Sequence, residues 1–253
     1  MRTKTLILLA FFLVSYLNVF SDETTDKFTK ANSLYRAGDY KAAAELYERI
    51  TETGYSSKEL YYNLGNSYFK LKMIPNSILN YERAHRIDPN DEDININLQI
   101  ANMQIVDKIE PVPRIFFEEW FDGFLEAIPS DTFAYVSFIS LWLGLGFTLL
   151  YIFAYHISLK KGAFGAGAIL LLVFLITLFL SHIDINRELS EKDAIIFSPS
   201  VYIKSSPDVQ ATDLFILHEG TKVRKLDEVD EWVKIKIPDG KVGWMPIKAA
   251  ITI

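Results

Sequence analysis

The segment Tyr61–Lys70 reads YYNLGNSYFK, and it decides the fold of the N-terminal part of the chain. The segment 34 residues earlier, Lys27–Arg36, reads KFTKANSLYR and repeats a small residue, an asparagine and an aromatic residue at the same places. Tyr47 and Tyr81 continue the correspondence at the same offset. Such a period indicates units of two antiparallel helices, in which small residues allow close packing and the tyrosines fill the gap to the neighbouring unit.

The repeat resembles the tetratricopeptide family, whose unit is about 34 residues long. The second unit matches best, because Tyr81, Ala84 and the helix-ending pair Asp88–Pro89 follow the quoted segment at the spacing of that family. The resemblance implies an all-α tetratricopeptide solenoid over residues 22–108, in which residues 93–106 form a third leading helix that caps the stack.

The leading helices of such a stack line a concave face, and this face is the candidate partner-binding site. Asparagine side chains there can hydrogen-bond a peptide backbone, and aromatic side chains can hold its side chains. The alternative is that these residues are solvated or pack on the capping helix. The residues at these positions are Asn32, Tyr35, Arg36, Tyr62, Asn63, Asn66, Phe69, Lys70 and Asn97.

Two long uncharged stretches, Phe133–Leu159 and Gly162–Ile183, are predicted to be transmembrane helices. At about 1.5 Å per residue, each exceeds the roughly 30 Å hydrocarbon core of a bilayer. Only Lys160 and Lys161 lie between them, and positive charges favour the cytoplasmic side. The sequence therefore predicts a two-pass protein of the bacterial inner membrane, with both soluble regions in the periplasm.

Residues 1–21 have the order of a secretory signal peptide. Arg2 and Lys4 come first, a short apolar run follows, and the small Ser21 precedes acidic sequence. The alternative is an uncleaved membrane anchor. Both interpretations translocate the chain from residue 22 onward, in agreement with the topology predicted from the two apolar helices.

Residues 109–132 are predicted to form an amphipathic segment in the membrane interface. Apolar residues recur there at helical spacing opposite acidic ones, and a tryptophan directly before a membrane span is typical of an interfacial helix. The alternative is that the segment docks onto the helical repeat or onto a partner. The apolar positions are Ile115, Phe116, Trp120, Phe124 and Ile128.

After residue 193 the pattern changes to short alternating runs separated by turn signals, which is typical of β-strands. We expect five strands, forming a small antiparallel barrel over residues 194–253. The strands are predicted at Ala194–Phe197, Val201–Lys204, Thr221–Leu226, Trp232–Ile237 and Val242–Met245.

Three motifs of this region stand at residues 201–207, 214–223 and 239–245. They resemble the bacterial SH3-like domain of exported proteins, which implies an all-β SH3-like barrel that binds protein or cell wall. Tyr202 and Phe215 are the candidate ligand face of this domain. Trp232 and Trp244 are expected mainly in the core, because so small a barrel needs large apolar side chains inside.

The composition excludes several classes of function. The net charge is −6 and no segment forms a basic stripe, which excludes nucleic-acid binding. The chain has no cysteine, and therefore neither disulfides nor thiolate metal sites. Its four histidines are scattered, and no nucleophile, base and orienting group converge in the sequence. We expect a non-enzymatic protein without cofactor or metal.

The order of signal peptide, helical repeat, interfacial segment, membrane hairpin and SH3-like domain resembles the BatE-type membrane proteins of bacterial aerotolerance operons. The resemblance implies a membrane-held scaffold that works with von Willebrand A-domain membrane proteins and a MoxR-type ATPase, in aerotolerance or envelope stress. A membrane anchor would raise the effective concentration of both binding regions for membrane-bound partners. The alternative hypothesis is an envelope anchor whose SH3-like domain binds peptidoglycan.

Overall fold

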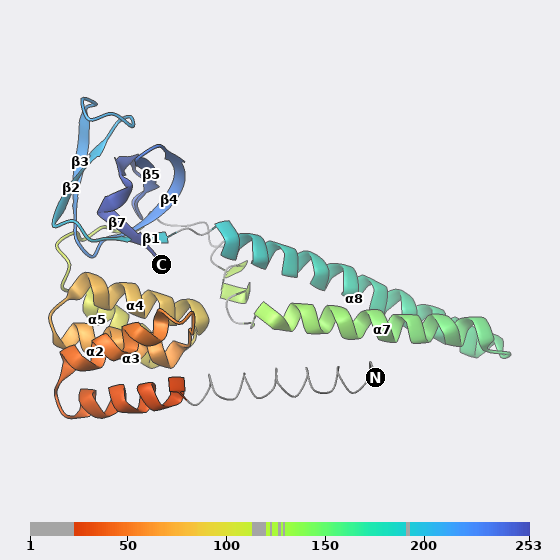
Figure 1. Ribbon diagram of the computed structural model, residues 1–253. Helices are drawn as coiled ribbons and strands as arrows, with labels where there is room; N and C mark the ends of the chain where they lie inside the picture. Colours follow the sequence, from red (N-terminus) through yellow and green to blue (C-terminus); the bar gives the residue numbers. More distant parts are fainter. Residues whose placement is uncertain (1–22, 113–119, 122, 126–127, 129, 191–192) are drawn as a thin grey trace, which may run out of the picture. The chain divides into compact units, whose positions relative to one another are not determined.

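The computed structural model describes residues 23–112, 120–121, 123–125, 128, 130–190 and 193–253 (Figure 1). These residues fall into two compact units. The first combines the chain up to Val112 with Asp193–Ile253, and the second is Pro113–Lys192. The predicted signal peptide lies outside the described residues, as does part of the predicted interfacial segment.

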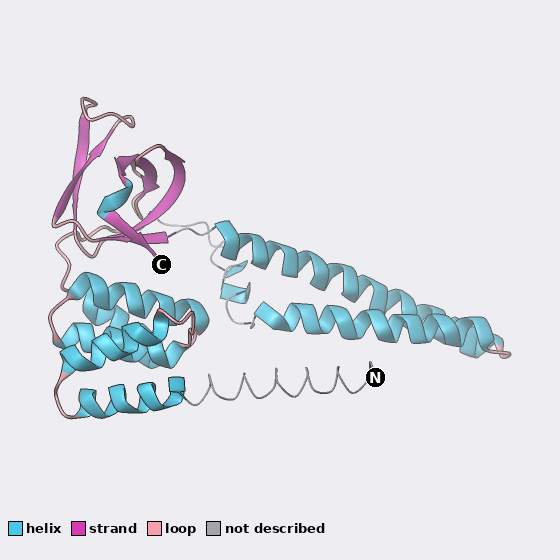
Figure 2. Cartoon of the chain, in the orientation of Figure 1, coloured by secondary structure: helices cyan, strands magenta, loops and turns pink. Residues whose placement is uncertain are grey.

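Helices build the N-terminal part of the first unit (Figure 2). Side chains cap the first turns of three of these helices, because Asp39, Ser57 and Asp91 each accept a hydrogen bond from a backbone N–H of the helix that follows. The helices are residues 23–36, α2 (Tyr40–Thr51), α3 (Lys58–Lys70), α4 (Ile74–Ile87) and α5 (Glu92–Asn102).

The third leading helix, α5, is shorter than the predicted range 93–106. It ends at Asn102, where Lys108 Nζ donates to the carbonyl oxygens of Asn102 and Met103 at 3.1 and 2.8 Å. A cation on these last carbonyls satisfies acceptors that have no partner inside the helix. The chain then leaves the helical repeat toward the C-terminal strands.

The packing of the helices follows the predicted repeat. Ala31 and Ala43 are completely buried, and Ser77 Oγ donates to the carbonyl oxygen of Gly65 at 3.0 Å. A Cβ atom on Gly65 would lie only 2.6 Å from the ring of Tyr81, so a glycine is needed at this helix crossing. The prediction that small residues permit close approach is confirmed. Tyr47 also shares a buried cluster with Leu60 and Leu64 of the next unit, as predicted for a tyrosine that fills the gap between units.

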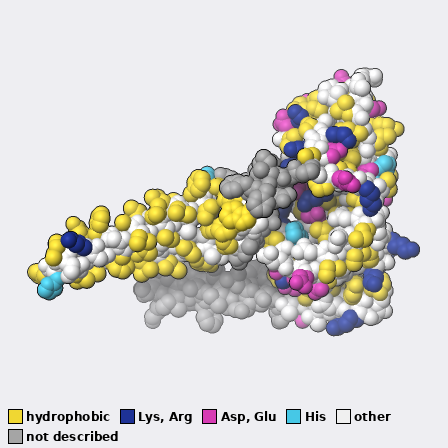
Figure 3. Space-filling model, turned by 180° about the vertical axis from the view of Figure 1, so that it is seen from behind, with side chains coloured by type: hydrophobic (Ala, Val, Ile, Leu, Met, Phe, Trp, Pro, Cys, Tyr) yellow, Lys and Arg dark blue, Asp and Glu magenta, His cyan; other side chains and the backbone are white. Residues whose placement is uncertain are grey.

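The second unit contains two helices long and apolar enough to span a membrane, α7 (Ser130–Phe153) and α8 (Ile157–Ser190). Hydrophobic side chains cover the face of this hairpin visible in Figure 3. The helix backbones approach closely, since a Cβ on Gly167 would lie 3.7 Å from Phe147 Cβ.

The connection between these helices differs from the predicted one. The first helix ends at Phe153 instead of Leu159, and the chain reverses at residues 154–156. Lys160 and Lys161 therefore belong to the beginning of α8. Because they remain within the first turns after the reversal, they still mark the same end of the hairpin.

The C-terminal part of the first unit is one antiparallel sheet of seven strands, in the order β3-β2-β6-β5-β4-β1-β7. Two strands were not predicted, β3 and β7. In the described chain no ladder joins these two edge strands, so the sheet is open and the expected closed barrel is not confirmed. The strands are β1 (Asp193–Ile196), β2 (Ser200–Lys204), β3 (Asp213–His218), β4 (Lys222–Val229), β5 (Trp232–Lys236), β6 (Val242–Pro246) and β7 (Ala250–Thr252).

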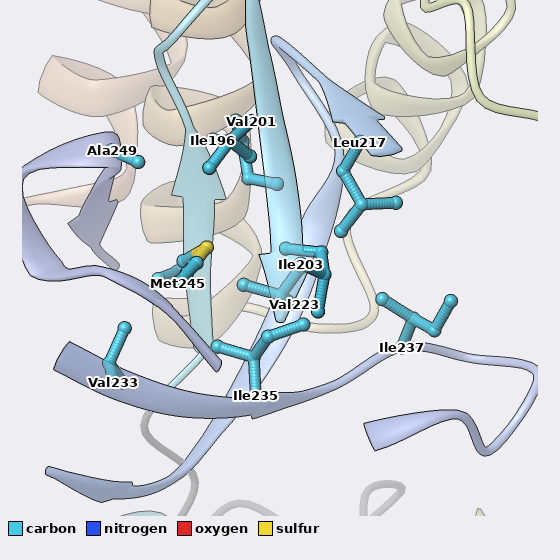
Figure 4. Close-up of a cluster of buried hydrophobic side chains, with 11 residues drawn as sticks. Ile196, Val201, Ile203, Leu217, Val223, Val233, Ile235, Ile237, Met245 and Ala249 are labelled. Atoms are coloured by element: carbon cyan, nitrogen blue, oxygen red, sulfur yellow. The ribbon is translucent and has the colours of Figure 1, made fainter. Parts of the chain in front are cut away.

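The core of this sheet is made of aliphatic side chains and one methionine. Figure 4 shows Ile203, Val223 and Ile235 pointing toward one another from β2, β4 and β5. All three are at most 1% exposed. The alternation along β5 places Val233 and Ile235 in this core and sends their neighbours to the opposite face.

Candidate functional site

The nine residues predicted for partner binding lie on the three leading helices, residues 23–36, α3 and α5. We call the surface that they form the leading-helix face. Its first element is the side-chain amide of Asn32, whose oxygen accepts two hydrogen bonds. Tyr47 Oη donates to Asn32 Oδ1 at 2.5 Å, and Asn63 Nδ2 donates to the same oxygen at 3.1 Å. This oxygen thus ties the first leading helix to α2 and α3.

The same arrangement recurs one repeat later. Tyr81 Oη donates to Asn66 Oδ1 at 2.7 Å, and Asn97 Nδ2 donates to that oxygen at 3.1 Å. Asn97 Nδ2 also lies 2.9 Å from Tyr62 Oη. The repeat is therefore a repeat of hydrogen bonds as well as of sequence. The capping helix takes part in it, as one of the two interpretations of these residues expected.

Donors and cations of the leading-helix face remain available to a ligand. Arg36 and Lys70 occupy equivalent places 34 residues apart, and both are exposed. Within the described residues, no hydrogen bond engages the Nδ2 group of Asn32 or Asn66. Because the Oδ1 atoms are already occupied, these amides are oriented to donate, and a backbone carbonyl is the matching acceptor.

The aromatic side chains of the face are half-buried. Tyr35 packs edge-on against Tyr40, with ring centroids 5.2 Å apart, and Phe69 packs against the buried cluster around Ile78. Each therefore presents part of a ring to solvent on a fixed support. Such surfaces can hold an apolar side chain with little loss of side-chain entropy.

The phenols behind the face stay protonated. Burial raises the pKa of Tyr47 to about 12, and burial likewise raises the pKa of Tyr81 well above its ordinary value. Both hydroxyls therefore donate to Asn32 and Asn66 at any physiological pH, and the amide orientation does not change with pH.

The two residues predicted for the ligand face of the C-terminal domain are not brought together. Tyr202 pairs with Ile216 on the face away from the core, and both are exposed. Phe215 pairs with Ile203, whose side chain lies in the core. The Phe215 side chain therefore points to the core side of the sheet, away from the face that carries Tyr202, and is half-buried there. Tyr202 alone remains on an accessible sheet face.

The tryptophans lie on the same outer face as Tyr202, and the prediction that they are mainly core is wrong. Trp232 and Trp244 alternate with the buried Val233 and Met245, and both are half-buried. Lys234 Nζ lies 5.9 Å from the centroid of the Trp244 ring. Branched aliphatic residues of neighbouring strands fill the core instead, so the two indole rings lie on the outer face of the sheet.

Sequence reasoning did not predict that the helical repeat and the sheet share a junction. Lys222 Nζ on β4 lies 2.7 Å from Glu82 Oε2 on α4 and 3.3 Å from Asp193 Oδ2 on β1. The Glu82 side chain is only 8% exposed. Burial alone would lower the pKa of Lys222, but the two carboxylates raise it above its ordinary value. Nothing in the spacing of residues 82 and 222 signals this pair.

A second junction is made by Asp107, after the last helix of the repeat. Its carboxylate accepts from the backbone N–H of His218 at 2.6 Å and from Thr221 Oγ1 at 2.7 Å, and Oδ1 lies 2.8 Å from His218 Nδ1. Between them, Gly220 has φ +86°, and a Cβ there would lie 2.5 Å from Ile105. The β3–β4 turn is thus fitted closely to the end of the helical repeat.

The Asp107 junction gives a pH-dependent prediction. Burial alone would raise the pKa of Asp107, but the hydrogen bonds from His218 and Thr221 hold it below its ordinary value. A carboxylate with a lowered folded-state pKa stabilises the fold above its unfolded pKa and loses this effect as the pH falls. We expect Asp107→Asn to cost about 1–3 kcal/mol at neutral pH. The cost should shrink below about pH 4.

Urea unfolding of the wild-type chain and the variant at pH 7 and pH 3.5 measures this difference. Asp208→Asn, at an exposed position of the β2–β3 loop, is the control. An equal loss of stability at both pH values would show that the Asp107 charge does not contribute.

Among the described residues, no group of three or more His, Asp or Glu side chains is arranged to hold a metal ion. Two surfaces of the described chain remain as candidate binding sites. One is the leading-helix face, and the other is the outer sheet face around Tyr202.

The two surfaces lie in segments of the chain that match two different family models. Residues 59–91 match the tetratricopeptide repeat model, and residues 199–249 match the bacterial SH3 domain model. No curated protein sequence matches the chain. Both matching families are typically binding domains without catalytic activity, which points to protein binding.

Proposed function

We propose that this chain is a non-enzymatic, membrane-anchored scaffold whose leading-helix face binds an extended segment of a partner protein. The observation that carries the proposal is the twice-repeated amide arrangement, which orients Asn32 and Asn66 as donors. Arg36 and Lys70 stand at equivalent exposed positions, and successive leading helices pack about 10 Å apart. A segment with acidic side chains at a matching separation suits this face.

The junctions support a two-pass topology. Residue 82 precedes the two apolar helices and residue 222 follows them, yet their side chains form an ion pair. This ion pair supports a hairpin of two spans, which returns the chain to the side of the membrane where it began. We place this side outside the bacterial inner membrane, because Lys160 and Lys161 at the hairpin end favour the cytoplasm.

The match of the sheet to the bacterial SH3 domain model supports the same location, because this domain type suggests a location outside the cytoplasm. In this proposal the repeat forms a tetratricopeptide solenoid and the sheet an SH3-like domain. The BatE-type order of regions adds a physiological role in aerotolerance or envelope stress. It also suggests as partners von Willebrand A-domain membrane proteins working with a MoxR-type ATPase.

Charge reversal on the leading-helix face tests the proposal. Arg36→Glu with Lys70→Glu should reduce crosslinked partner recovered from native membranes at least tenfold, because both reversals repel an acidic segment. Both side chains are exposed, so the fold should survive. The matched control is Lys41→Glu with Arg49→Glu, which makes the same charge change at two exposed positions of α2. Equal recovery with the double variant and the control would contradict the proposal.

A second candidate function is peptidoglycan binding by the outer sheet face. It is favoured by the exposure of Tyr202 and Ile216 beside the half-buried Trp232 and Trp244. The full chain in detergent should then sediment with purified cell wall, and Tyr202→Ala should reduce the sedimented fraction. If the wild-type chain stays in the supernatant, this function is excluded.

A further inference from the structure

The two apolar helices α7 and α8 leave a groove between them. Its volume is about 490 Å³, within the roughly 300–1,000 Å³ of ligand pockets. Small residues on both helices keep this space open, among them Gly144 on α7 and Ala163, Gly167 and Ala168 on α8. We call this space the hairpin groove.

The hairpin groove covers only the half of the hairpin nearest the turn. Its lining runs from Ser140 to Tyr151 on α7 and from Ala163 to Phe174 on α8, which is about 16 Å of each helix. The hydrocarbon core of a bilayer is about 30 Å thick, so the groove has the length of a single leaflet. A lipid acyl chain extends through one leaflet, whereas a parallel membrane-spanning helix would contact the hairpin along its full length.

Most of the hairpin groove is apolar toward a ligand. The hydroxyl groups of Ser140 and Thr148 donate to carbonyl oxygens of their own helix, both at 2.9 Å. They therefore need no polar partner from a ligand. No Asp, Glu, Lys or Arg lies among residues 132–159 or 162–183. A hydrocarbon chain suits this part of the groove.

The end of the groove at the turn has a different character. Tyr151 and Phe164 form this end, with ring centroids 6.1 Å apart, and Lys160 Nζ lies 5.7 Å from the centroid of the Tyr151 ring. Lys160 precedes Phe164 by four residues, on the side of α8 that lines the groove. Within the described residues, no hydrogen bond or ion pair engages Lys160 Nζ or Tyr151 Oη. Both groups can donate to the oxygen atoms of a phosphate.

We propose that the hairpin groove binds one anionic phospholipid, with an acyl chain between α7 and α8 and its phosphate at Lys160 and Tyr151. An apolar groove that ends at an unpaired cation is complementary to a ligand with an apolar tail and an anionic head. In the proposed topology this lipid belongs to the cytoplasmic leaflet. The inference rests on the membrane anchoring of the proposed function, but it involves none of the leading-helix residues.

Native mass spectrometry of the full chain in detergent measures the bound lipid directly. The chain is mixed with equal amounts of dioleoylphosphatidylglycerol and dioleoylphosphatidylcholine, which have the same acyl chains but differ in net charge. Phosphatidylglycerol should be bound at least about fivefold more often, because a single lysine near an anionic headgroup favours binding by that factor. Equal binding of the two lipids would overturn the proposal.

Ala168→Trp tests the acyl-chain site. Ala168 lines the groove at an exposed position, so an indole there should fill the groove and leave the contact between the helices intact. We expect about tenfold less of both bound lipids, because the indole occupies the space of the acyl chain. The matched control is Ile169→Trp, at a position that is 65% exposed and outside the groove lining. If both variants bind as much lipid as each other, the proposal is wrong.

Moving the lysine tests the headgroup site. Lys160→Ser with Ser158→Lys keeps the number of positive charges at the hairpin end, so the topology should not change. Positions two residues apart on a helix differ by about 200°, so the cation leaves the side that lines the groove. The preference for phosphatidylglycerol should fall by about fivefold, while binding of phosphatidylcholine stays the same. An unchanged preference would contradict the role of Lys160.

A different occupant of the groove would give a different result. If Ala168→Trp lowers partner recovery or the amount of dimer while lipid binding stays at the level of Ile169→Trp, the groove receives a helix and the lipid proposal is wrong. Arg36→Glu with Lys70→Glu should leave lipid binding unchanged. Lipid binding and partner recovery are therefore separate readouts, and the lipid site and the scaffold function can fail independently.

Discussion

Gly243→Val is expected to unfold the C-terminal sheet or to destabilise it by about 3 kcal/mol. A Cβ atom at this place on β6 would lie 2.4 Å from Ile203 Cγ2 and 3.0 Å from the carbonyl oxygen of Lys204. The isoleucine is completely buried, and the carbonyl belongs to the neighbouring strand. Neither atom can move away without disturbing the core or the ladder.

Thermal unfolding of the full chain in detergent measures this effect, and a loss of about 3 kcal/mol corresponds to roughly 10 °C. Ser200→Val is the matched control, because it adds the same side chain at an exposed position of β2. It should change the midpoint by no more than about 1–2 °C. A Gly243→Val protein as stable as this control would contradict the packing described for β2 and β6.

Lys222→Met is expected to cost about 2–3 kcal/mol, although its own side chain is 41% exposed. The substitution leaves Glu82, 8% exposed, without its cation, and it weakens the environment of Asp193, 11% exposed. A carboxylate that is nearly buried and unpaired is far more costly than the ion pair is favourable.

The double variant Glu82→Leu with Lys222→Met distinguishes a buried charge from simple loss of contacts. It should recover most of the stability, because two apolar side chains replace the pair. Urea unfolding of wild type, both single variants and the double variant gives the coupling energy. Strictly additive losses would show that the two side chains do not interact, and the junction between repeat and sheet would have to be abandoned.

The helical repeat was the most predictable part of the fold. The 34-residue period depends on packing between residues that lie close together in the sequence, such as the contact of Gly65 with the Tyr81 ring. The two apolar helices were equally accessible, because length and uncharged composition are sufficient to find them. Their exact ends were not, since Leu159 and Phe153 are both apolar and composition does not distinguish a helix end from its continuation.

The sheet was less predictable because its strands depend on distant pairing. Residues 213–218, the unpredicted β3, contain the alternating Leu214, Ile216 and His218 on one side, but their strand forms only against β2. The placement of Trp232 and Trp244 failed for a similar reason. The size of the two tryptophans favoured a place in the core. The alternation along β5 and β6 instead buries Val233, Ile235 and Met245 and puts the tryptophans on the outer face.

For the candidate site, the sequence indicated the face residues but not their bonds. The asparagines were expected to hydrogen-bond a peptide backbone. The structure instead uses the Oδ1 atoms of Asn32 and Asn66 internally. The junction residues Glu82, Asp107 and Lys222 were missed altogether, because contacts between residues more than 100 places apart leave no periodic signal.

The proposed topology puts the repeat and the sheet in the same compartment outside the inner membrane, while the hairpin end reaches the cytoplasm. Three single-cysteine variants of this cysteine-free chain test it most directly: Glu45→Cys, Lys236→Cys and Ser158→Cys, the last beside the two lysines and without changing them. A membrane-impermeant maleimide should label the first two in intact spheroplasts, and Ser158→Cys only after the membrane is disrupted. Labelling of Ser158→Cys in intact spheroplasts, with positions 45 and 236 protected, would contradict the account.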